Sequence, residues 1–458
     1  MTEKRTNGAA ANNTTAKDTT ANNTMVDVVV IGAGMAGVSA ARALSQGDLE
    51  VLVVEAGDRV GGRVSTVRDF AGAPVEAGAE FIHGKGAATW SDVRRAGLRT
   101  EPVPYSGSWF RLGGRRRWLP AHLTHPGVWR SFDILWSLGR LDGRDRSAAD
   151  FIAQKGYKGR SRELAALTLT AHLPGGIDEV GVAGLAADGV LHLESGVNHR
   201  VVDGYDSLPA HIATGLAIEL GFRVQRIDWG PDGVELTADD GRTVTARAAV
   251  STLPHGVLRR GNIEFGPALT KAKADAIARI STGAVAKVLI AFDEAFWPRR
   301  MTQLVCGDGP ITLYWPTSYG TEGPPVLSAY ATGPRARALS DAGEAVATEM
   351  VLADLCSLYP DAPVRRLVRA TRFIDWETDP NALGGYTFLP PGAVGARADL
   401  AAPTTGALFW AGSATHWTPV ADTVEAAYLS GLRAAREVSS HLRGAAISLP
   451  AGVAQPAG

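Results

Sequence analysis

The stretch VDVVVIGAGMAG at residues 26–37 decides the fold, because an apolar run leads directly into a turn that contains three glycines. A stretch of helical character follows, and then a second apolar run at residues 51–54 ends at Glu55. The order of elements is therefore strand, tight turn, helix, strand and acid. This order predicts a β-α-β unit of the kind that binds nucleotides.

Each glycine of the turn has a physical reason. Gly32 permits the turn, Gly34 lets the backbone approach a pyrophosphate, and Gly37 lets the helix pack closely on the strand. Free N–H groups at the start of the helix, where Ala36 lies, then face the phosphates. Glu55 stands where a carboxylate can accept both ribose hydroxyls of an adenosine. The alternative is a tight turn with accidental glycines, and the unit alone does not separate FAD from NAD.

Other segments resemble the flavin-containing amine oxidase superfamily, which includes monoamine oxidases, polyamine oxidases, L-amino-acid oxidases and lysine-specific histone demethylases. EAGDRVGGR at residues 55–63 is similar to the family's sequence after the dinucleotide turn. FWAGSATHW at residues 409–417 and TVEAAYLSG at residues 423–431 are similar to its C-terminal flavin-binding strand and helix. The resemblance runs from about Asp27 to about Val438, with the motifs in the family's order. It implies FAD as the cofactor.

The resemblance also implies a fold of α/β and α+β type, in which a Rossmann-like FAD-binding domain is interleaved with a substrate domain of mixed sheet and helices. We expect three segments in the FAD-binding domain and two in the substrate-binding domain: 25–85, 200–282 and 384–445 for the first, and 86–199 and 283–383 for the second. Residues 1–24 are expected to form a disordered tail, and residues 446–458 a second tail. Ligands are expected where the two domains meet.

Local patterns predict the elements between these motifs. Residues 86 to about 199 read as mostly helical, with apolar residues at helical spacing around 128–141 and 162–173, and another helix is predicted at 209–220. Alternating strands with hairpin signals are predicted at 222–227, 233–238 and 248–254. In the family, the residue that corresponds to Val224 binds adenine through its backbone. Plain strand packing is the alternative for this residue.

Composition narrows the class of protein. The chain has 458 residues, 45% of them hydrophobic and 20% charged, which is typical of a soluble protein with room for two domains. A net charge of −1 argues against nucleic-acid binding, and the basic run at 115–117 follows two glycines, which favours a solvated hairpin turn. No apolar run approaches the roughly 20 residues that span a bilayer.

The two cysteines, Cys306 and Cys356, have neither metal-ligand spacing nor a disulfide framework. Residues 1–24 lack the apolar core of a signal peptide. We therefore expect a cytoplasmic protein without a metal ion or a membrane anchor. Its partners are expected to be a small amine and O₂, and the sequence leaves the oligomeric state open, with a homodimer as one option.

Lys287 lies in the strand-like run AVAKVLIAF at residues 284–292, whose other members are all apolar. Burying an ammonium is costly unless the charge is paired or neutralised, so this lysine needs an explanation. One alternative is an edge strand from which the amine reaches water. The resemblance, which continues through residues 296–298, implies instead the lysine that holds a water against flavin N5.

In the family, a neutral amine passes hydride from its α-carbon to flavin N5. The imine is hydrolysed to a carbonyl product, and O₂ reoxidises the flavin to give H₂O₂. The resemblance therefore implies an FAD-dependent amine oxidase. The alternatives are an oxidase of an L-amino acid or of an amine-bearing secondary metabolite, and a scaffold that binds FAD without catalysis.

Tyr386 lies in LGGYTFLPPG at residues 383–392, and a core aromatic beside a turn is one interpretation of it. The resemblance implies an aromatic wall that holds the substrate against the flavin and favours the neutral amine. Where monoamine oxidases carry the cysteine that bonds to FAD, this chain has Gly385, which predicts non-covalent FAD. Thr423 stands where they carry a second tyrosine, and Trp417 is a candidate replacement that would contact the substrate.

His83 lies in GAEFIHG at residues 78–84, a segment that resembles the polyamine oxidase segment with a histidine near the substrate. We predict catalytic and substrate-binding roles for His83, with a structural histidine as the alternative. Glu80 lies near the flavin or faces solvent. The arginine with which L-amino-acid oxidases bind a carboxylate is missing after the corresponding glycine-alanine pair. The predicted FAD site comprises Gly32, Gly34, Ala36, Gly37, Glu55, Ala56, Gly62, Arg63, Ala79, Glu80, Val224, Gly412, Ser413, Thr423 and Val424.

Overall fold

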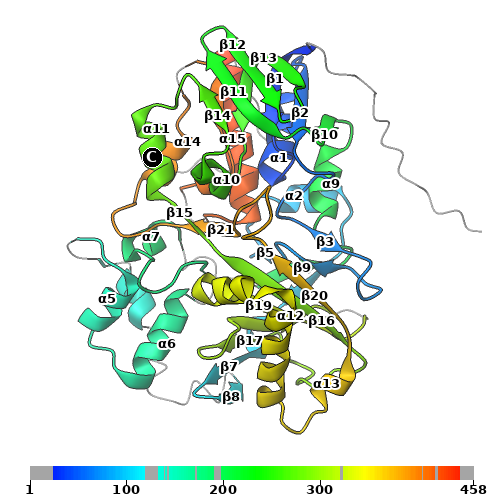
Figure 1. The fold of residues 1–458 in the computed structure, drawn as a ribbon, viewed down its shortest axis with the longest axis vertical. Helices are drawn as coiled ribbons and strands as arrows, with labels where there is room; N and C mark the ends of the chain where they lie inside the picture. The colour runs from blue at the N-terminus through cyan, green and yellow to red at the C-terminus, as the bar shows by residue number, and fades with distance from the viewer. Residues whose placement is uncertain are drawn as a thin grey trace, which may run out of the picture.

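The computed structural model describes residues 24–118, 133–138, 140–141, 144–170, 173–189, 197–319, 323–404, 406–417 and 421–443. The two expected tails lie outside these residues, apart from Thr24. A large sheet with helices α1 and α15 lies at one end of the molecule, and a second sheet with helix α12 lies toward the other end (Figure 1). No helix within the described ranges is long and apolar enough to cross a bilayer.

The first sheet has eight strands and is built around the predicted β-α-β unit. Its strand order is β10-β2-β1-β13-β12-β11-β14, and β22 pairs with β13 beside this path. Strands β10, β2, β1, β13 and β22 run parallel, whereas β12 is antiparallel to both β13 and β11. The strands are β1 (Thr24–Ile31), β2 (Val51–Glu55), β10 (Ala217–Leu220), β11 (Val224–Gly230), β12 (Gly233–Ala238), β13 (Thr243–Ser251), β14 (Glu264–Gly266) and β22 (Leu408–Trp410).

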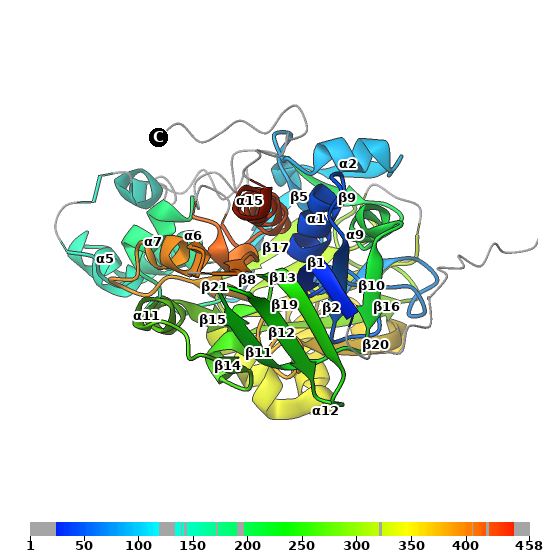
Figure 2. The same ribbon diagram turned by 90° about the horizontal axis from the view of Figure 1, so that it is seen from above.

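Helices α1 (Met35–Leu44) and α15 (Val424–Arg443) pack against each other, although they are far apart in the sequence (Figure 2). The Ser39 hydroxyl donates to the Tyr428 carbonyl at 3.1 Å. A Cβ at Gly431 would lie 2.2 Å from the Ala36 carbonyl oxygen, so this glycine allows the close approach. The N-terminal glycine motif and the C-terminal flavin-binding motif, which are more than three hundred residues apart in the sequence, are therefore neighbours.

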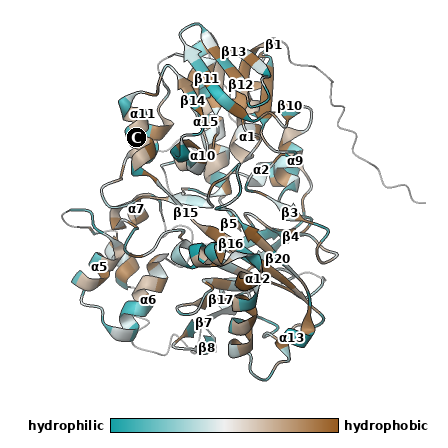
Figure 3. Ribbon diagram, in the orientation of Figure 1, coloured by the Kyte–Doolittle hydropathy of each residue, from teal (hydrophilic) through white to brown (hydrophobic). Residues whose placement is uncertain are grey.

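The second sheet has seven strands in the order β20-β16-β19-β18-β17-β7-β8. Strand β16 lies between two neighbours, and all eight of its residues are buried. Helix α12 (Gly333–Leu358), which is interrupted by a kink at Gly343, packs on this sheet. In Figure 3, apolar residues colour much of β1 of the first sheet, whereas α6 (Gly159–Thr170) carries hydrophilic segments. The strands are β7 (Ser108–Leu112), β8 (Arg115–Trp118), β16 (Val285–Phe292), β17 (Gln303–Cys306), β18 (Leu313–Pro316), β19 (Val326–Thr332) and β20 (Val368–Asp375).

Short elements connect the two large sheets. Strand β9 (Asn198–Val201) pairs with β5 (Ile82–His83) and β6 (Thr100–Val103), β15 (Ser281–Gly283) pairs with β21 (Tyr386–Phe388), and β3 (Thr66–Val67) pairs with β4 (Val75–Glu76). The remaining helices are α2 (Trp90–Arg95), α5 (Ala148–Gln154), α7 (Val182–Ala187), α9 (Ser207–Ala213), α10 (His255–Arg260), α11 (Lys271–Arg279), α13 (Val364–Leu367) and α14 (Ala396–Ala401).

Two predictions about local structure were wrong. The helix predicted at 209–220 ends at Ala213, because Gly215 adopts a φ of 77° and the next residues form β10 beside β2. The described residues of the range 86–199 are not mostly helical, since β6, β7 and β8 lie between residues 100 and 118. The predicted hairpin is present, but its arginines form β8 after a turn at Gly113 and Gly114. The helical pattern at 128–141 lies partly outside the described residues, and residues 133–138 of it are helical.

Candidate active site

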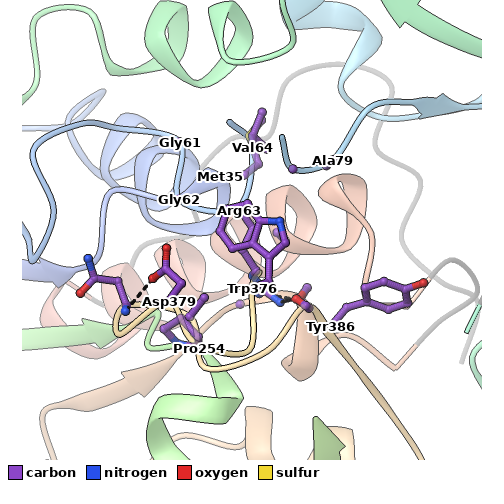
Figure 4. A pocket seen from close by; sticks show the side chains of 18 of the residues that line it. Met35, Gly61, Gly62, Arg63, Val64, Ala79, Pro254, Trp376, Asp379 and Tyr386 are labelled. Carbon is purple, nitrogen blue, oxygen red and sulfur yellow. Dashed lines mark hydrogen bonds between the residues drawn. The ribbon is translucent and has the colours of Figure 1, made fainter. Parts of the chain in front are cut away.

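A cavity of about 760 Å³ is lined by segments from across the chain. They include the turn after β1, the end of β2, parts of 56–64 and 78–81, the start of β11, parts of 376–387, residues 412–413 and parts of 421–427. Figure 4 shows the segment 61–64 across from the loop that carries Trp376, Asp379 and Tyr386. The convergence of remote segments on one cavity is the arrangement that the sequence motifs predicted.

The N-terminus of α1 forms one wall of this cavity through Gly34, Met35 and Ala36. A Cβ at Gly37 would lie 1.8 Å from the Gly32 carbonyl oxygen, whereas a Cβ at Gly34 would meet no atom within 4 Å. Gly37 is therefore required for packing, and Gly34 leaves space in front of the helix. The first turn of α1 contains no acidic residue and no capping side chain, so its N–H groups are available to an anion. These residues fit the pyrophosphate of FAD.

The carboxylate of Glu55 is held at the end of β2. One oxygen accepts the Ala33 N–H at 2.6 Å and the other accepts the Gly57 N–H at 2.8 Å. Glu55 lines the cavity together with Ala56 and Val224, and Val224 begins β11. This end of the cavity therefore combines an acid with the start of a strand that lines the cavity, as expected for an adenosine site.

Arg63, Ser413 and Asp422 connect three segments of the cavity wall. Arg63 donates to the Gly385 carbonyl and, at 3.1 Å, to the Ser413 hydroxyl. Asp422 accepts from the Ser413 hydroxyl and from both the backbone N–H and the hydroxyl of Thr387. Sequence reasoning missed Asp422, a non-glycine residue with a φ of 58°.

The electrostatics of Asp422 explain why it stays charged while buried. Burial alone would raise the pKa of Asp422, but the charges of Arg397 and Arg63 and the hydroxyl hydrogen bonds outweigh burial and lower it. Arg397 in turn binds Asp188 at 2.8 Å with two nitrogens. The result is a buried polar network that fixes the segment after Tyr386.

Lys287 lies on β16, the second strand in the order of the second sheet, with its side chain almost completely buried. The edge-strand alternative is therefore wrong, because β16 has a partner on each side. Its Nζ donates to the Glu76 and Gly78 carbonyls, both at 2.9 Å, and lies 3.3 Å from Glu80 Oε2. Burial lowers the pKa of Lys287, and the charge of Glu80 opposes this effect.

Aromatic side chains surround the cavity near Lys287. The hydroxyls of Tyr330 and Tyr386 are 2.8 Å apart, and the Trp315 ring lies 5.2 Å from the Tyr330 ring. Trp376 donates its indole N–H to the Ala77 carbonyl at 3.1 Å. Sequence reasoning found only Tyr386 among these, although the aromatic residues of β18 and β19 were a possible signal.

Trp417 is not brought into this group. Its side chain is 45% exposed, it does not line the cavity, and the Arg433 guanidinium lies 5.5 Å from the centre of its ring. Trp417 therefore lies outside the cavity lining, to which Tyr330 adds a second aromatic hydroxyl, and the contact of Trp417 with substrate stays a prediction. Residue 417 follows the turn of 3-10 helix at Ser413–Thr415, and its ring packs against Arg433.

His83 lines the cavity as part of a row of neutral polar groups. Its Nδ1 lies 3.0 Å from Asn198 Oδ1, and the Asn198 amide donates to the Tyr105 hydroxyl at 3.2 Å. All three residues line the cavity. Burial lowers the pKa of His83, so the ring is neutral near pH 7.

Every predicted site residue lines the cavity except Gly37, which packs behind it, and Trp417. Thr423 accepts the Ala426 N–H at 3.1 Å at the start of α15, next to Val424. The roles of these residues toward FAD remain predictions.

A glycine turn, a strand-ending acid and one long cavity between two sheets define a dinucleotide-binding enzyme fold. The sequence matches the family of flavin containing amine oxidoreductases over residues 35–439, and the chain belongs to this family. It is an FAD-dependent enzyme that oxidises amines.

Relatives with known names agree with this assignment. Polyamine oxidase 2 of Arabidopsis thaliana is 31% identical, with 90% of this chain and 87% of that protein covered. Polyamine oxidase 4 of Oryza sativa subsp. japonica is 30% identical, with 90% and 88% covered. The structure of wild-type putrescine oxidase bound to putrescine superposes with a TM-score of 0.81, at 20% identity, over 92% of this chain and all of that chain. This last similarity concerns the fold alone.

Proposed function

We propose that the amine is oxidised where Lys287, Tyr330 and Tyr386 line the cavity, with O₂ as the electron acceptor and H₂O₂ as a product. The observation that carries this proposal is a buried lysine amine beside aromatic walls, in the same cavity as the uncapped start of α1. When bound, FAD supplies the two-electron redox chemistry. The protein contributes the position of the amine and the exclusion of water.

The residues of the cavity divide between cofactor and substrate. The turn at Gly32–Gly34 and the start of α1 would hold the pyrophosphate, Glu55 the ribose, and the backbone of Val224 the adenine. Arg63, Gly412, Ser413, Thr423 and Val424 would bind the remainder of FAD. Both cysteines lie in the described part of the chain and neither lines the cavity, which supports non-covalent FAD. The two sheets support the division into an FAD-binding domain of three segments and a substrate domain of two.

For the substrate we propose a polyamine or a related alkylamine. The relatives named polyamine oxidases support this class. The reacting carbon would lie against the tyrosines, and the row of His83, Asn198 and Tyr105 would donate or accept hydrogen bonds to a second polar group of the amine.

An amino-acid oxidase is the second candidate, and the arginines of the cavity disfavour it. Arg59 is bound to backbone carbonyls, Arg63 to Gly385 and Ser413, and Arg223 to Asn381. Among the described residues that line the cavity, every arginine is therefore already engaged. A substrate carboxylate has no free guanidinium to bind there.

The test is an anaerobic titration of the purified yellow protein with polyamines, arylalkylamines, cyclic amines and amino acids. We expect a polyamine or alkylamine to bleach the flavin, and air to restore the colour with formation of H₂O₂. A folded protein that retains no flavin would contradict the proposal. A response confined to amino acids would favour the second candidate, and colour that air does not restore would exclude O₂ as the acceptor.

A further inference from the structure

Glu80 and Arg200 form a buried ion pair next to the Lys287 amine. Glu80 Oε1 accepts two hydrogen bonds from Arg200 of β9, at 3.0 Å from Nε and 2.8 Å from Nη2. Glu80 Oε2 accepts the Trp315 indole N–H at 2.8 Å and lies 3.3 Å from Lys287 Nζ. The side chains of Glu80 and Arg200 are only 3% and 7% exposed. One carboxylate is therefore shared by two cationic groups that have almost no contact with water.

Two cations and one anion cannot be buried together without cost. An arginine side chain stays charged at any pH that a folded protein meets, whereas a lysine can lose its proton when it is buried. The Arg200 guanidinium therefore stays charged and remains an ion-pair partner of Glu80 at any such pH. Lys287 is the member of this cluster that can become neutral, and burial lowers its pKa.

The other groups that face Lys287 do not act on its charge as Glu80 and Arg200 do. Glu76 accepts from the Lys287 amine through its backbone carbonyl, while its carboxyl accepts from the Tyr205 N–H and the Thr66 hydroxyl. Tyr330 stands opposite Lys287 on β19, and its hydroxyl is bonded to Tyr386. On the other side, the register partner on β20 is Ile374, which has no charge.

We propose that Glu80 and Arg200 are positioning residues that set the charge of Lys287 in opposite directions: Glu80 favours the ammonium, and Arg200 favours the neutral amine by sharing the charge of Glu80. The proposal rests on the proposed function in so far as the charge of Lys287 matters for amine oxidation. A positive charge there disfavours a cationic substrate near the aromatic wall, and a neutral amine can accept a proton at Nζ.

The proposal can be tested because substitutions of Glu80 and Arg200 should shift the protonation midpoint of Lys287 in opposite directions. Glu80→Gln removes the anion and should lower the pH at which Lys287 takes up a proton. Arg200→Met leaves Lys287 as the only cationic partner of Glu80 and should raise the pH at which Lys287 takes up a proton. An opposite charge at this distance shifts such a midpoint by about one to three pH units. The double variant, Glu80→Gln with Arg200→Met, buries no ion pair, should fold most readily, and should lie between the two single variants.

The measurement is ¹³C NMR of the FAD-loaded protein with ¹³C-labelled lysines, with no amine present. The chain has few lysines, and the Cε signal that disappears in Lys287→Met belongs to Lys287. Lys273 is an internal control, because it is also buried but donates to the carbonyls of Asp399, Leu400 and Ala402. Its signal should be the same in every variant. The pH profile of flavin reoxidation, measured in parallel, should move with the Lys287 midpoint.

Shifts of opposite sign in the two single variants would support the proposal. Shifts of the same sign, or a Lys287 midpoint that neither variant changes, would overturn it. If Arg200→Met does not fold, the double variant compared with Glu80→Gln decides: a higher midpoint in the double variant supports the proposal, because the charge of Arg200 no longer disfavours the ammonium, and an equal or lower midpoint overturns it. These signals do not depend on finding a substrate, so failure of the proposed function would be seen separately in the bleaching titration.

Discussion

Tyr330 and Tyr386 join two sheets through a hydrogen bond of 2.8 Å between their hydroxyls. Tyr330 belongs to β19 of the second sheet, and Tyr386 begins β21, which pairs with β15. Burial raises the pKa of both phenols, so both remain neutral. Because both residues line the cavity, this bond couples the orientation of the aromatic wall to the packing of the sheet that carries Lys287.

Tyr330→Phe should remove this bond while keeping the ring. We expect the free energy of unfolding to fall by about 1 kcal/mol, because a buried hydrogen bond is lost. We also expect KM for the amine to rise, because Tyr386 loses its orientation. Urea unfolding and steady-state kinetics measure the two effects. Tyr359→Phe is a matched control, since that buried hydroxyl contacts Met301 Sδ at 3.7 Å outside the cavity lining. An unchanged KM in Tyr330→Phe would show that the pair does not orient the substrate.

Gly34 and Gly37 should respond differently to alanine. A methyl group at Gly34 meets no protein atom, so Gly34→Ala should fold with a loss of about 1 kcal/mol or less. It should nevertheless weaken FAD binding by roughly tenfold, because the methyl group occupies the space in front of the helix. Gly37→Ala collides with the Gly32 carbonyl and should lower the free energy of unfolding by about 3 kcal/mol.

Flavin fluorescence on release and thermal unfolding of the flavin-free protein measure these two effects. Equal FAD affinity in Gly34→Ala and the wild type would place the pyrophosphate elsewhere.

Lys287→Met tests the role of the lysine itself. Because Lys287 is the buried amine of the cavity, we expect amine-dependent reduction or reoxidation of the flavin to slow by about 100-fold, while FAD stays bound. Lys271→Met is the control, because this lysine is 87% exposed on α11. Stopped-flow absorbance separates the two half-reactions, and unchanged rates for both would remove Lys287 from the mechanism.

Short-range patterns account for what the sequence predicted well. The glycine turn, Glu55 and the buried strand around Lys287 each follow from residues within one element or one β-α-β unit. The edge-strand alternative for Lys287 could not be excluded from the sequence, because sheet order is decided by distant segments. Only the structure shows β16 between β19 and β20.

The missed site residues depend on register and on loops. Tyr330 faces the site because it is the register partner of Lys287, and Arg200 reaches Glu80 only through the pairing of β9 with β5. Asp422 enters the site through an irregular backbone conformation. The wrong helix at 209–220 has a similar origin, since β10 is defined by its pairing with β2 and not by its own residues.

The raised pKa of the buried Glu76 carboxyl predicts how the free energy of unfolding depends on pH. Burial raises its pKa from the ordinary 4.5 to about 8, because hydrogen bonds from Tyr205 and Thr66 compensate only in part. Between these pH values the folded protein holds a proton on Glu76 that the unfolded chain has released. The stability that Glu76 contributes is therefore full below pH 4.5 and is lost as the pH rises through 8.

Glu76→Gln keeps the shape of the neutral acid and removes its titration. The difference in unfolding free energy between this variant and the wild type should be small below pH 4.5 and should increase in favour of the variant up to about pH 8. Urea unfolding across this range measures it. Glu235→Gln, at an exposed position of β12, should parallel the wild type at every pH. A wild type that gains stability relative to Glu76→Gln as the pH rises would show that Glu76 is ionised in the folded protein.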